Sequence, residues 1–268
     1  MKKVKISILM TVFNHQKYVH SSIKSILKQS FRDFEFVIID NGSTDASKYI
    51  MKKFKDKRIR FYFLKKNIGR TNCLNYGLSK CNSKYIAILD SDDISQKDRL
   101  KVQYDHLEKN KNIKLVASNY NVIDEKNKIL KRSNIKDDLL HNPNKILFEN
   151  IIAHSTVMYR KELVNKIGLY PKQFKYAQDY AFYLKAIQNN QIDLITKNLV
   201  YLRSNHKDSE SFRLNRSKLI QIEELKLIFW IFGNIETNLY EKIKLLFKFF
   251  KINLKILRFY LSNLNPTN

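Results

Sequence analysis

Short apolar runs alternate with amphipathic segments along the first third of the chain. Residues 6–13 and 34–39 are apolar, β-prone runs with the length of strands that are buried on both faces. The segment between them carries apolar residues at helical spacing, at Val19, Ile23, Ile26 and Leu27. This pattern predicts a strand, an amphipathic helix and a second strand.

The alternation continues to residue 89. Turn-forming residues at 40–45 precede a predicted helix that runs to about residue 54, and a third strand is expected over residues 59–64. A third helix is expected over residues 71–80 and a fourth strand over residues 85–89. Strands and helices that alternate in units of about 30 residues predict a doubly wound, mostly parallel α/β sheet.

Polar residues follow three of these strands at the point where each strand ends. They lie at residues 11–14, at Asp40 and at residues 90–93. The carboxyl ends of parallel strands meet at one edge of a sheet, and ligands bind outside that edge. The three loops together therefore predict one ligand site.

The fourth strand ends at three carboxylates, Asp90, Asp92 and Asp93. Charge at the mouth of a buried strand is costly unless a cation or hydrogen-bond donors compensate for it. In an extended segment Asp90 and Asp92 point to the same side, which suits a divalent cation that keeps positions open for phosphate oxygens. The alternative is a polar loop in which Asp93 or Ser95 caps the next helix.

The composition indicates a folded and strongly basic protein. Apolar residues make up 44% of the 268, and the net charge of +25 favours an anionic partner. Lysine is abundant throughout the chain, so the charge alone selects no partner. Cys73 and Cys81 lack metal-ligand spacing and are expected to be reduced thiols of a cytoplasmic protein. No cleavable signal and no run of about 18 apolar residues is present, so we expect the protein not to cross a membrane.

Two other binding classes can be weighed against these residues. A dinucleotide-binding fold needs a glycine-rich turn after its first strand, and residues 11–17 contain no glycine. A nucleic-acid binder would explain the charge, but acidic strand ends repel phosphate when no metal is bound. Neither a zinc-finger pattern nor an aromatic RNA-binding motif is present. We therefore expect neither NAD nor nucleic acid as a partner.

The polar motifs resemble, in order and spacing, those of family 2 glycosyltransferases, which have the nucleotide-diphospho-sugar transferase (GT-A) fold. The motifs are ILMTVFN at 8–14, IDNGSTD at 39–45, NIGR at 67–70, DSDD at 90–93, DRL at 98–100, HSTVMYR at 154–160, QDY at 178–180 and YLR at 201–203. The resemblance covers roughly residues 4–210. Thr11 stands where the family often has proline, and Asn41 stands where a second aspartate is common, which leaves Asp40 as the sole acid there. Pyrophosphorylases that make nucleotide sugars share the general fold but use a glycine-rich first loop, which is absent here.

The resemblance implies roles for individual residues. Thr11, Val12 and Phe13 line the base, Asp40 accepts a hydrogen bond from uracil, and Asp90 contacts the ribose. The full substrate-binding set is Thr11, Val12, Phe13, Asn14, Asp40, Asn67, Arg70, Asp90, Ser91 and His206. His206 is expected to close over the diphosphate, with a solvated loop histidine as the alternative.

The resemblance also implies a metal and a catalytic base. Asp92 holds Mn²⁺ or Mg²⁺ on the diphosphate, and Asp93 is the second metal candidate because the register of the acidic cluster is not fixed by sequence. Asp179 matches the position of the base. It opens a helix-like run over residues 180–187, where a carboxylate is favoured. The alternative for Asp179 is a plain helix N-cap.

The implied activity is inverting transfer of a hexosyl or N-acetylhexosaminyl group from a nucleotide-diphospho-sugar, with UDP as the expected carrier, to an acceptor hydroxyl. Bacterial enzymes of this type extend surface polysaccharides (capsule, lipopolysaccharide or lipooligosaccharide) on lipid-linked acceptors at the cytoplasmic membrane face. The alternative is an inactive scaffold of the same fold or a nucleotide-binding protein. We expect a catalytic domain over residues 1–212, divided into a nucleotide-sugar half (1–110) and an acceptor half (111–212), and a helical extension over residues 213–268.

The extension contains two helix-like runs, at 219–232 and 240–264. The second run carries a basic stripe, formed by Lys244, Lys248, Lys251, Lys255 and Arg258. The stripe lies opposite apolar residues, namely Leu245, Phe249, Ile252, Ile256 and Phe259. Basic amphipathic helices of this kind lie on anionic membrane surfaces. The alternative is a helix that packs on the catalytic domain or on a second subunit.

Overall fold

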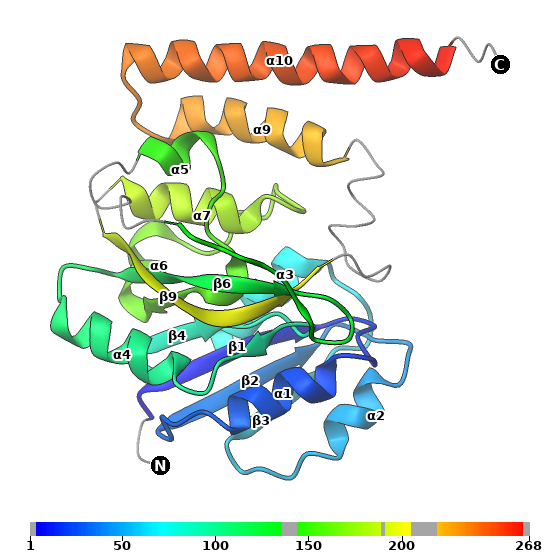
Figure 1. Ribbon diagram of the computed structural model, residues 1–268, viewed down its shortest axis with the longest axis vertical. Helices are drawn as coiled ribbons and strands as arrows, with labels where there is room; N and C mark the ends of the chain where they lie inside the picture. Colours follow the sequence, from blue (N-terminus) through cyan, green and yellow to red (C-terminus); the bar gives the residue numbers. More distant parts are fainter. Residues whose placement is uncertain (1–3, 136–143, 189–190, 205–218, 265–268) are drawn as a thin grey trace. The chain divides into compact units, whose positions relative to one another are not determined.

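The computed structural model describes residues 4–135, 144–188, 191–204 and 219–264, and of residues 144–145 and 258–264 only the backbone (Figure 1). The chain divides into two compact units, Met1–His206 and Lys207–Asn268. His206, the expected diphosphate contact, lies outside the described residues.

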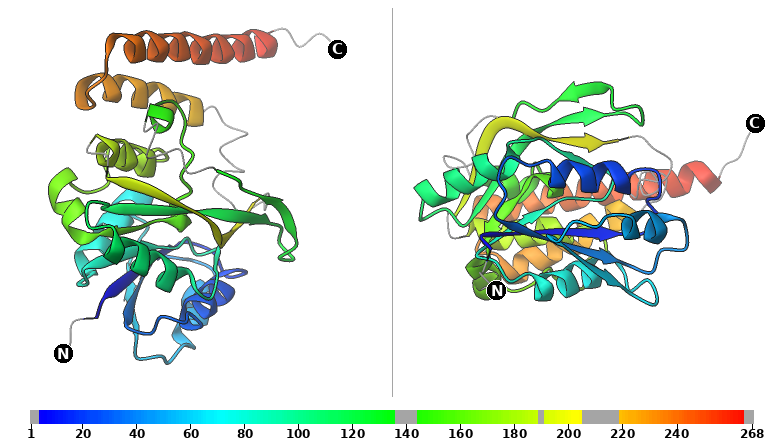
Figure 2. Two further views of the ribbon diagram at one scale, coloured as in Figure 1. Left: turned by 60° about the vertical axis from the view of Figure 1, so that its left-hand side comes forward. Right: turned by 90° about the horizontal axis from the view of Figure 1, so that it is seen from below.

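The first unit is built on a nine-stranded sheet, and helices cover it (Figures 1 and 2). Its strands are β1 (Ile6–Val12), β2 (Phe34–Asp40), β3 (Ile59–Phe63), β4 (Tyr85–Ile88), β5 (Ile94–Ser95), β6 (Leu115–Ile123), β7 (Ile129–Arg132), β8 (Met158–Arg160) and β9 (Ile192–Arg203). Its helices are α1 (Val19–Leu27), α2 (Ser47–Lys52), α3 (Arg70–Lys80), α4 (Arg99–Lys109), α5 (Asn144–Phe148), the 3₁₀ helix η1 (His154–Thr156), α6 (Lys161–Ile167) and α7 (Gln178–Ile187).

The strand order is β3-β2-β1-β4-β8-β6-β9-β5, and β7 pairs with β6. The first four strands are parallel to one another, as are β6 and β9, whereas β8 is antiparallel to both of its neighbours, β4 and β6. The prediction of a mostly parallel α/β sheet of the GT-A type is therefore confirmed. Each strand and helix expected before residue 89 is present, with bounds that differ by a few residues at most.

The apolar residues of β1 divide between the two faces of the sheet. Ile6, Ile8 and Met10 are fully buried in a core that they share with α1, α2 and α4. Leu9 points to the other face and meets α3, where a Cβ on Gly77 would lie 2.3 Å from the Leu9 Cδ1. Alternation of side chains along a strand explains this division. Because both faces are covered, ligands can reach only the edges of the sheet.

The second unit contains two helices, α9 (Leu219–Asn234) and α10 (Leu239–Leu264), which pack against each other. The rings of Phe229 on α9 and Phe249 on α10 meet edge to face, with their centroids 5.3 Å apart. Of the apolar face that the sequence places opposite the basic stripe, Leu245 and Ile252 are buried, and Phe249 contacts α9. Among the described residues, no helix combines the length and the apolarity of a membrane span.

Candidate active site

The loops after β1 and β2 leave the sheet side by side. Val12 pairs with Asp40 in the parallel register, and the N–H of Asn41 donates to the Val12 carbonyl at 2.8 Å. Asn14 has a left-handed backbone (φ 56°), which asparagine tolerates better than most residues. Its side-chain Oδ1 accepts the N–H of Thr44 at 2.8 Å. The first loop is therefore fastened to the second.

The three residues assigned to the base differ in exposure. Phe13 is 39% exposed and Thr11 is half-buried, whereas Val12 is fully buried in the core. The side chain of Val12 therefore packs in the core under the loop, and of the three side chains that of Phe13 is the most open to a ligand.

Asn41 joins the loop after β2 to the loop before α3. Its Oδ1 accepts the N–H of Ile68 at 3.0 Å, and its Nδ2 donates to Asn67 Oδ1 at 3.1 Å. A carboxylate has no proton to donate to Asn67, so an amide makes a bridge here that an ionised aspartate could not make. Asp40 is itself buried, and its carboxylate accepts the N–H of Ser43 at 3.3 Å.

Gly42 lets these two loops approach closely. It has φ +73°, and a Cβ at this position would lie 2.6 Å from the backbone carbon of Lys66. Only glycine fits both the conformation and the space. The sequence predicts this segment as a turn, and the contact with residues 66 and 67 was not predicted.

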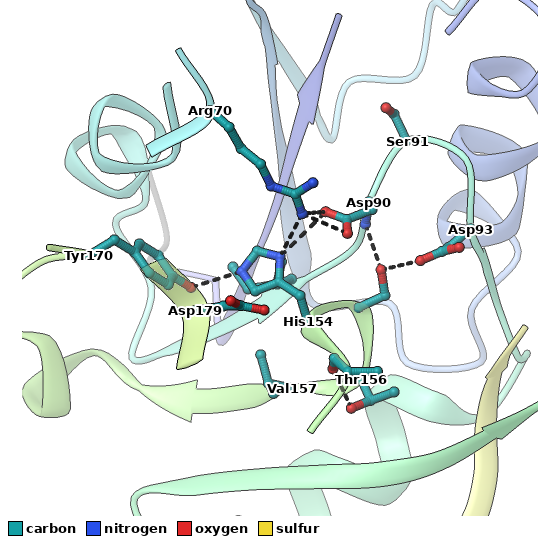
Figure 3. A network of polar contacts seen from close by, with 12 residues as sticks. Arg70, Asp90, Ser91, Asp93, His154, Thr156, Val157, Tyr170 and Asp179 are labelled. Carbon is teal, nitrogen blue, oxygen red and sulfur yellow. Dashed lines mark hydrogen bonds and ion pairs between the residues drawn. The ribbon is translucent and has the colours of Figure 1, made fainter. Parts of the chain in front are cut away.

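Asp90, directly beyond β4, forms an ion pair with Arg70, the first residue of α3 (Figure 3). Arg70 Nη2 lies 2.9 and 2.8 Å from the two oxygens of the Asp90 carboxylate. Burial by itself raises the pKa of Asp90, but the charge of Arg70 and the contact with His154 outweigh burial and hold the pKa below its usual value. Asp90 is therefore ionised over the whole physiological pH range.

His154 extends this network into the protein (Figure 3). It belongs to η1 and is buried, with Nδ1 at 3.4 Å from Asp90 Oδ1 and Nε2 at 3.2 Å from the Tyr170 hydroxyl. Burial raises the pKa of Tyr170, so its hydroxyl stays protonated. In the sequence His154 was identified only as part of the motif at residues 154–160, and no role was predicted for it.

The acidic segment is not extended, so the prediction that Asp90 and Asp92 alternate along an extended chain is wrong. Ser91 and Asp92 form a turn that the Asp93 N–H closes on the Asp90 carbonyl at 3.2 Å. The Ser91 hydroxyl lies 2.7 Å from Nδ1 of His15 in the first loop. The turn leaves Asp92 half-buried and sends Asp93 into the protein.

Asp93 is buried, and both of its carboxylate oxygens accept hydrogen bonds. One accepts the hydroxyl of Ser155, and the other accepts the backbone N–H of Arg203 at 2.9 Å. Burial, with the charges of Asp92 and Asp90, raises the pKa of Asp93 well above its usual value in spite of these donors. The capping alternative is wrong, because the residue at the N-cap of α4 is Asp98.

The acidic turn determines which metal site fits. Within the described ranges, no group of three or more His, Cys, Asp or Glu side chains could hold a metal ion. Mg²⁺ and similar cations at nucleotide sites are commonly held by one or two carboxylates together with phosphate oxygens and water. Asp92 offers one half-buried carboxylate at the turn, which fits a cation of that kind, whereas Asp93 is buried.

Asp179 lies in the first turn of α7. The N-cap residue of this helix is Ala177, so Asp179 does not occupy the N-cap position, and its Oδ1 accepts the N–H of Tyr180 at 2.8 Å. Figure 3 shows Asp179 beside His154 and Tyr170, and its charge is one of the causes that raise the pKa of Tyr170. The structure therefore brings Asp179 close to the Asp90 network, across 89 positions of the sequence.

Comparisons with known proteins show the family of this chain. The family model described as "Glycosyl transferase family 2" matches residues 7–168. The O-antigen biosynthesis glycosyltransferase WbnJ of Escherichia coli is 34% identical in an alignment over 220 residues. The alignment covers 78% of this chain and 83% of that protein.

Two solved structures share the fold. S. aureus TarS 1–349 in complex with UDP-GlcNAc superposes with a TM-score of 0.70 at 22% identity, over 94% of this chain and 73% of TarS 1–349. The mannosyltransferase PcManGT of Pyrobaculum calidifontis, in complex with GDP-Man and Mn²⁺, superposes with a TM-score of 0.66 at 16% identity, over 93% of this chain and 70% of that one.

Proposed function

Since the chain belongs to glycosyl transferase family 2, we propose that it is an inverting enzyme that moves a hexosyl or N-acetylhexosaminyl group from a UDP-linked sugar to an acceptor hydroxyl. The observation that carries the proposal is the meeting of four separate segments at one edge of the sheet. These are the loops at Asn14 and Asn41, the acidic turn at residues 90–93, and Asp179 at the start of α7.

The nucleotide lies over the first three of these segments. The exposed ring of Phe13 stacks on the base, and Asp40 accepts a hydrogen bond from uracil at the end of β2. Asn67 and Arg70 border the nucleotide on the other side. Asp90, already oriented by Arg70, contacts the ribose. The complex of TarS 1–349 with UDP-GlcNAc supports UDP as the carrier, although that likeness is one of fold.

The diphosphate requires positive charge. Asp92 is the residue that would hold Mn²⁺ or Mg²⁺ there, and the complex of PcManGT with GDP-Man and Mn²⁺ supports a divalent cation as the counter-charge, although that likeness is one of fold. When bound, the cation stabilises the negative charge that develops on the departing nucleoside diphosphate. The buried Asp93 holds the turn in place, because its carboxylate fastens the turn to Ser155 and Arg203.

Asp179 acts as the general base. It accepts the proton of the acceptor hydroxyl, whose oxygen attacks the anomeric carbon from the face opposite the leaving group. One displacement breaks the bond between the sugar and the diphosphate, forms the new glycosidic bond and inverts the anomeric carbon. His154 and Tyr170 border Asp179 and limit its orientation (Figure 3).

The acceptor is a saccharide, free or linked to a lipid, in the synthesis of a bacterial surface polysaccharide. The similarity to WbnJ, an O-antigen biosynthesis glycosyltransferase, supports this class of acceptor. Such an acceptor places the enzyme in the cytoplasm, at the inner face of the cytoplasmic membrane.

A thermal-shift experiment tests donor binding. UDP should raise the melting temperature more with Mn²⁺ than with EDTA, because a ligand that binds only the native state stabilises it. Asp92→Ala should remove the difference that Mn²⁺ makes, and Asp105→Ala, which removes an exposed carboxylate of α4, should retain it. Equal shifts with Mn²⁺ and with EDTA in the unmodified protein would overturn the metal assignment.

A further inference from the structure

Helix α10 has a second apolar face that the sequence analysis did not single out. The first face is packed, with Leu245 and Ile252 buried. The second face is open, and its side chains are those of Ile243, Leu246, Phe247, Phe250, Leu254 and Leu257, which are 45%, 46%, 71%, 61%, 55% and 54% exposed. Large apolar side chains gathered on one exposed face indicate an interaction surface.

These side chains form one stripe along the helix. Positions 243, 247, 250, 254 and 257 follow one another at steps of four and three, which is the spacing of residues on a single helical face. At a rise of about 1.5 Å per residue the stripe is roughly 20 Å long. The side chains of Phe247 and Phe250 lie in its middle and are its most exposed members.

A row of lysines runs alongside this stripe. Lys244, Lys248, Lys251 and Lys255 each follow directly a member of the stripe, so the row lies about 100° further round the helix. Lys251 and Lys255 are exposed. On the other side of the stripe Lys242 is exposed as well. The apolar face is therefore bordered by a row of lysines along one side and by a single lysine, at its first turn, on the other side.

Charge identifies the occupant of this face. A second copy of a chain with net charge +25 would bring two rows of lysines together at the contact. An anionic lipid surface instead offers phosphate to the lysines and acyl chains to the phenylalanines. Helices that lie in the plane of a membrane interface have this arrangement of one apolar face beside basic residues.

We propose that α10 docks on an anionic lipid surface through Ile243, Phe247, Phe250, Leu254 and Leu257, with the flanking lysines on the lipid headgroups. The helix lies along the surface while its opposite face stays packed on α9. This inference rests on the proposed function, because docking would bring the enzyme to the membrane that holds a lipid-linked acceptor. The docking itself involves none of the residues assigned to transfer.

The test uses the full chain and co-sedimentation with vesicles, with no sugar transfer in the readout. The protein should bind vesicles of phosphatidylcholine with 30% phosphatidylglycerol, and binding to pure phosphatidylcholine should be at least tenfold weaker. Phe247→Ser with Phe250→Ser should lower the partition coefficient on the anionic vesicles at least tenfold. Both side chains are exposed, so the variant should keep its fold and its UDP-induced thermal shift.

The matched control is Ile129→Ser with Leu130→Ser, which removes two exposed apolar side chains of β7 and should bind vesicles like the unmodified protein. Failure of the unmodified protein to bind anionic vesicles would overturn the proposal. Unchanged vesicle binding by the variant with Phe247→Ser and Phe250→Ser would also overturn it. The same holds if the unmodified protein forms a dimer that this variant abolishes. A chain that binds UDP but no vesicles would leave the proposed function standing and remove only the docking surface.

Discussion

The backbone N–H of Arg203 donates to Asp93 Oδ1 at 2.9 Å, which fastens the end of β9 to the acidic turn across 110 positions of the sequence. The Nε of the Arg203 side chain donates a hydrogen bond to the Asp92 carbonyl oxygen at 3.0 Å. Its Nη2 donates to Asn127 Oδ1 at 2.7 Å in the hairpin between β6 and β7, and its guanidinium lies 4.8 Å from the centre of the Tyr18 ring. One arginine therefore fixes the turn relative to three other segments.

Arg203→Lys should loosen the turn. Lysine keeps the charge but loses the planar fork of donors, so the bonds to Asp92 and Asn127 cannot both be made. We expect the free energy of unfolding to fall by about 1–2 kcal/mol, at about 1 kcal/mol for each hydrogen bond lost. Urea denaturation measures the fall, and the metal-dependent part of the UDP thermal shift should shrink with it.

Arg132→Lys is the matched control, because Arg132 is exposed on β7 and the substitution should change neither quantity. A stable Arg203→Lys variant with a full metal-dependent shift would show that the turn holds its shape without the guanidinium.

Arg70→Met should destabilise the protein in a pH-dependent way. The pKa of Asp90 is held below its unfolded value of about 3.9, so ionised Asp90 stabilises the fold above that pH. This stabilisation is lost as the pH falls from about 4 through the folded pKa. Arg70→Met removes the charge that opposes burial, so the unfolding free energies should differ by about 1–2 kcal/mol at pH 7, and the difference should shrink as the pH falls from about 4 towards the folded pKa.

Denaturant titrations at pH 7, 5 and 3.5 measure this decrease. Lys101→Met breaks the exposed ion pair with Asp105 and should leave the stability unchanged at each pH. A difference between the unmodified protein and Arg70→Met that stays constant down to pH 3.5 would contradict the electrostatic account of Asp90.

Gly42→Ala should cost more stability than a substitution at another glycine with positive φ. At Gly168, φ is +85° and no atom lies within 4 Å of an added Cβ, so alanine meets only backbone strain of about 1–2 kcal/mol. At Gly42 the same strain is joined by a clash with the backbone of residues 66 and 67, for a total of about 2–4 kcal/mol. Thermal denaturation of the two variants compares them. Equal losses would mean that the two loops can move apart freely.

The sequence was sufficient to predict the first half of the sheet, because each of its strands is a short, mostly apolar run next to a helix-period segment. The place of the site followed from the same pattern, since parallel strands end at one edge. Arg70 and Asp90 were both predicted site residues, and the structure joins them in an ion pair.

The supports of the site were not predictable in the same way. His154 and Ser155 belong to η1, just before β8, which enters the sheet antiparallel between β4 and β6, and Arg203 is the last residue of β9. No periodicity in the sequence indicates that these segments meet at the acidic turn. The extended form of residues 90–92 was also wrong, because the bonds of Asp93 to Ser155 and Arg203 favour a turn. In α10, the sequence was used to predict one apolar face, and the second one, at residues 243, 247, 250, 254 and 257, was not singled out although its helical spacing is equally regular.

We propose that this chain transfers sugar with Asp179 as the base. Asp179→Asn keeps the size of the side chain and its acceptor for the Tyr180 N–H, and it removes the basic oxygen. The control is Asp105→Asn, which changes an exposed aspartate in the same way. Both variants should show the UDP thermal shift of the unmodified protein.

The most direct measurement is the acceptor-dependent release of UDP, with Mn²⁺, UDP-linked hexoses and N-acetylhexosamines, and lipid-linked saccharides from bacterial membranes as acceptors. We expect the unmodified protein and Asp105→Asn to release UDP from at least one donor. In Asp179→Asn the rate of release should be lower by about 10²-fold or more. Release by Asp179→Asn at the rate of the unmodified protein would contradict the role of the base. Absence of release from every donor by a protein that binds UDP would contradict the transfer itself.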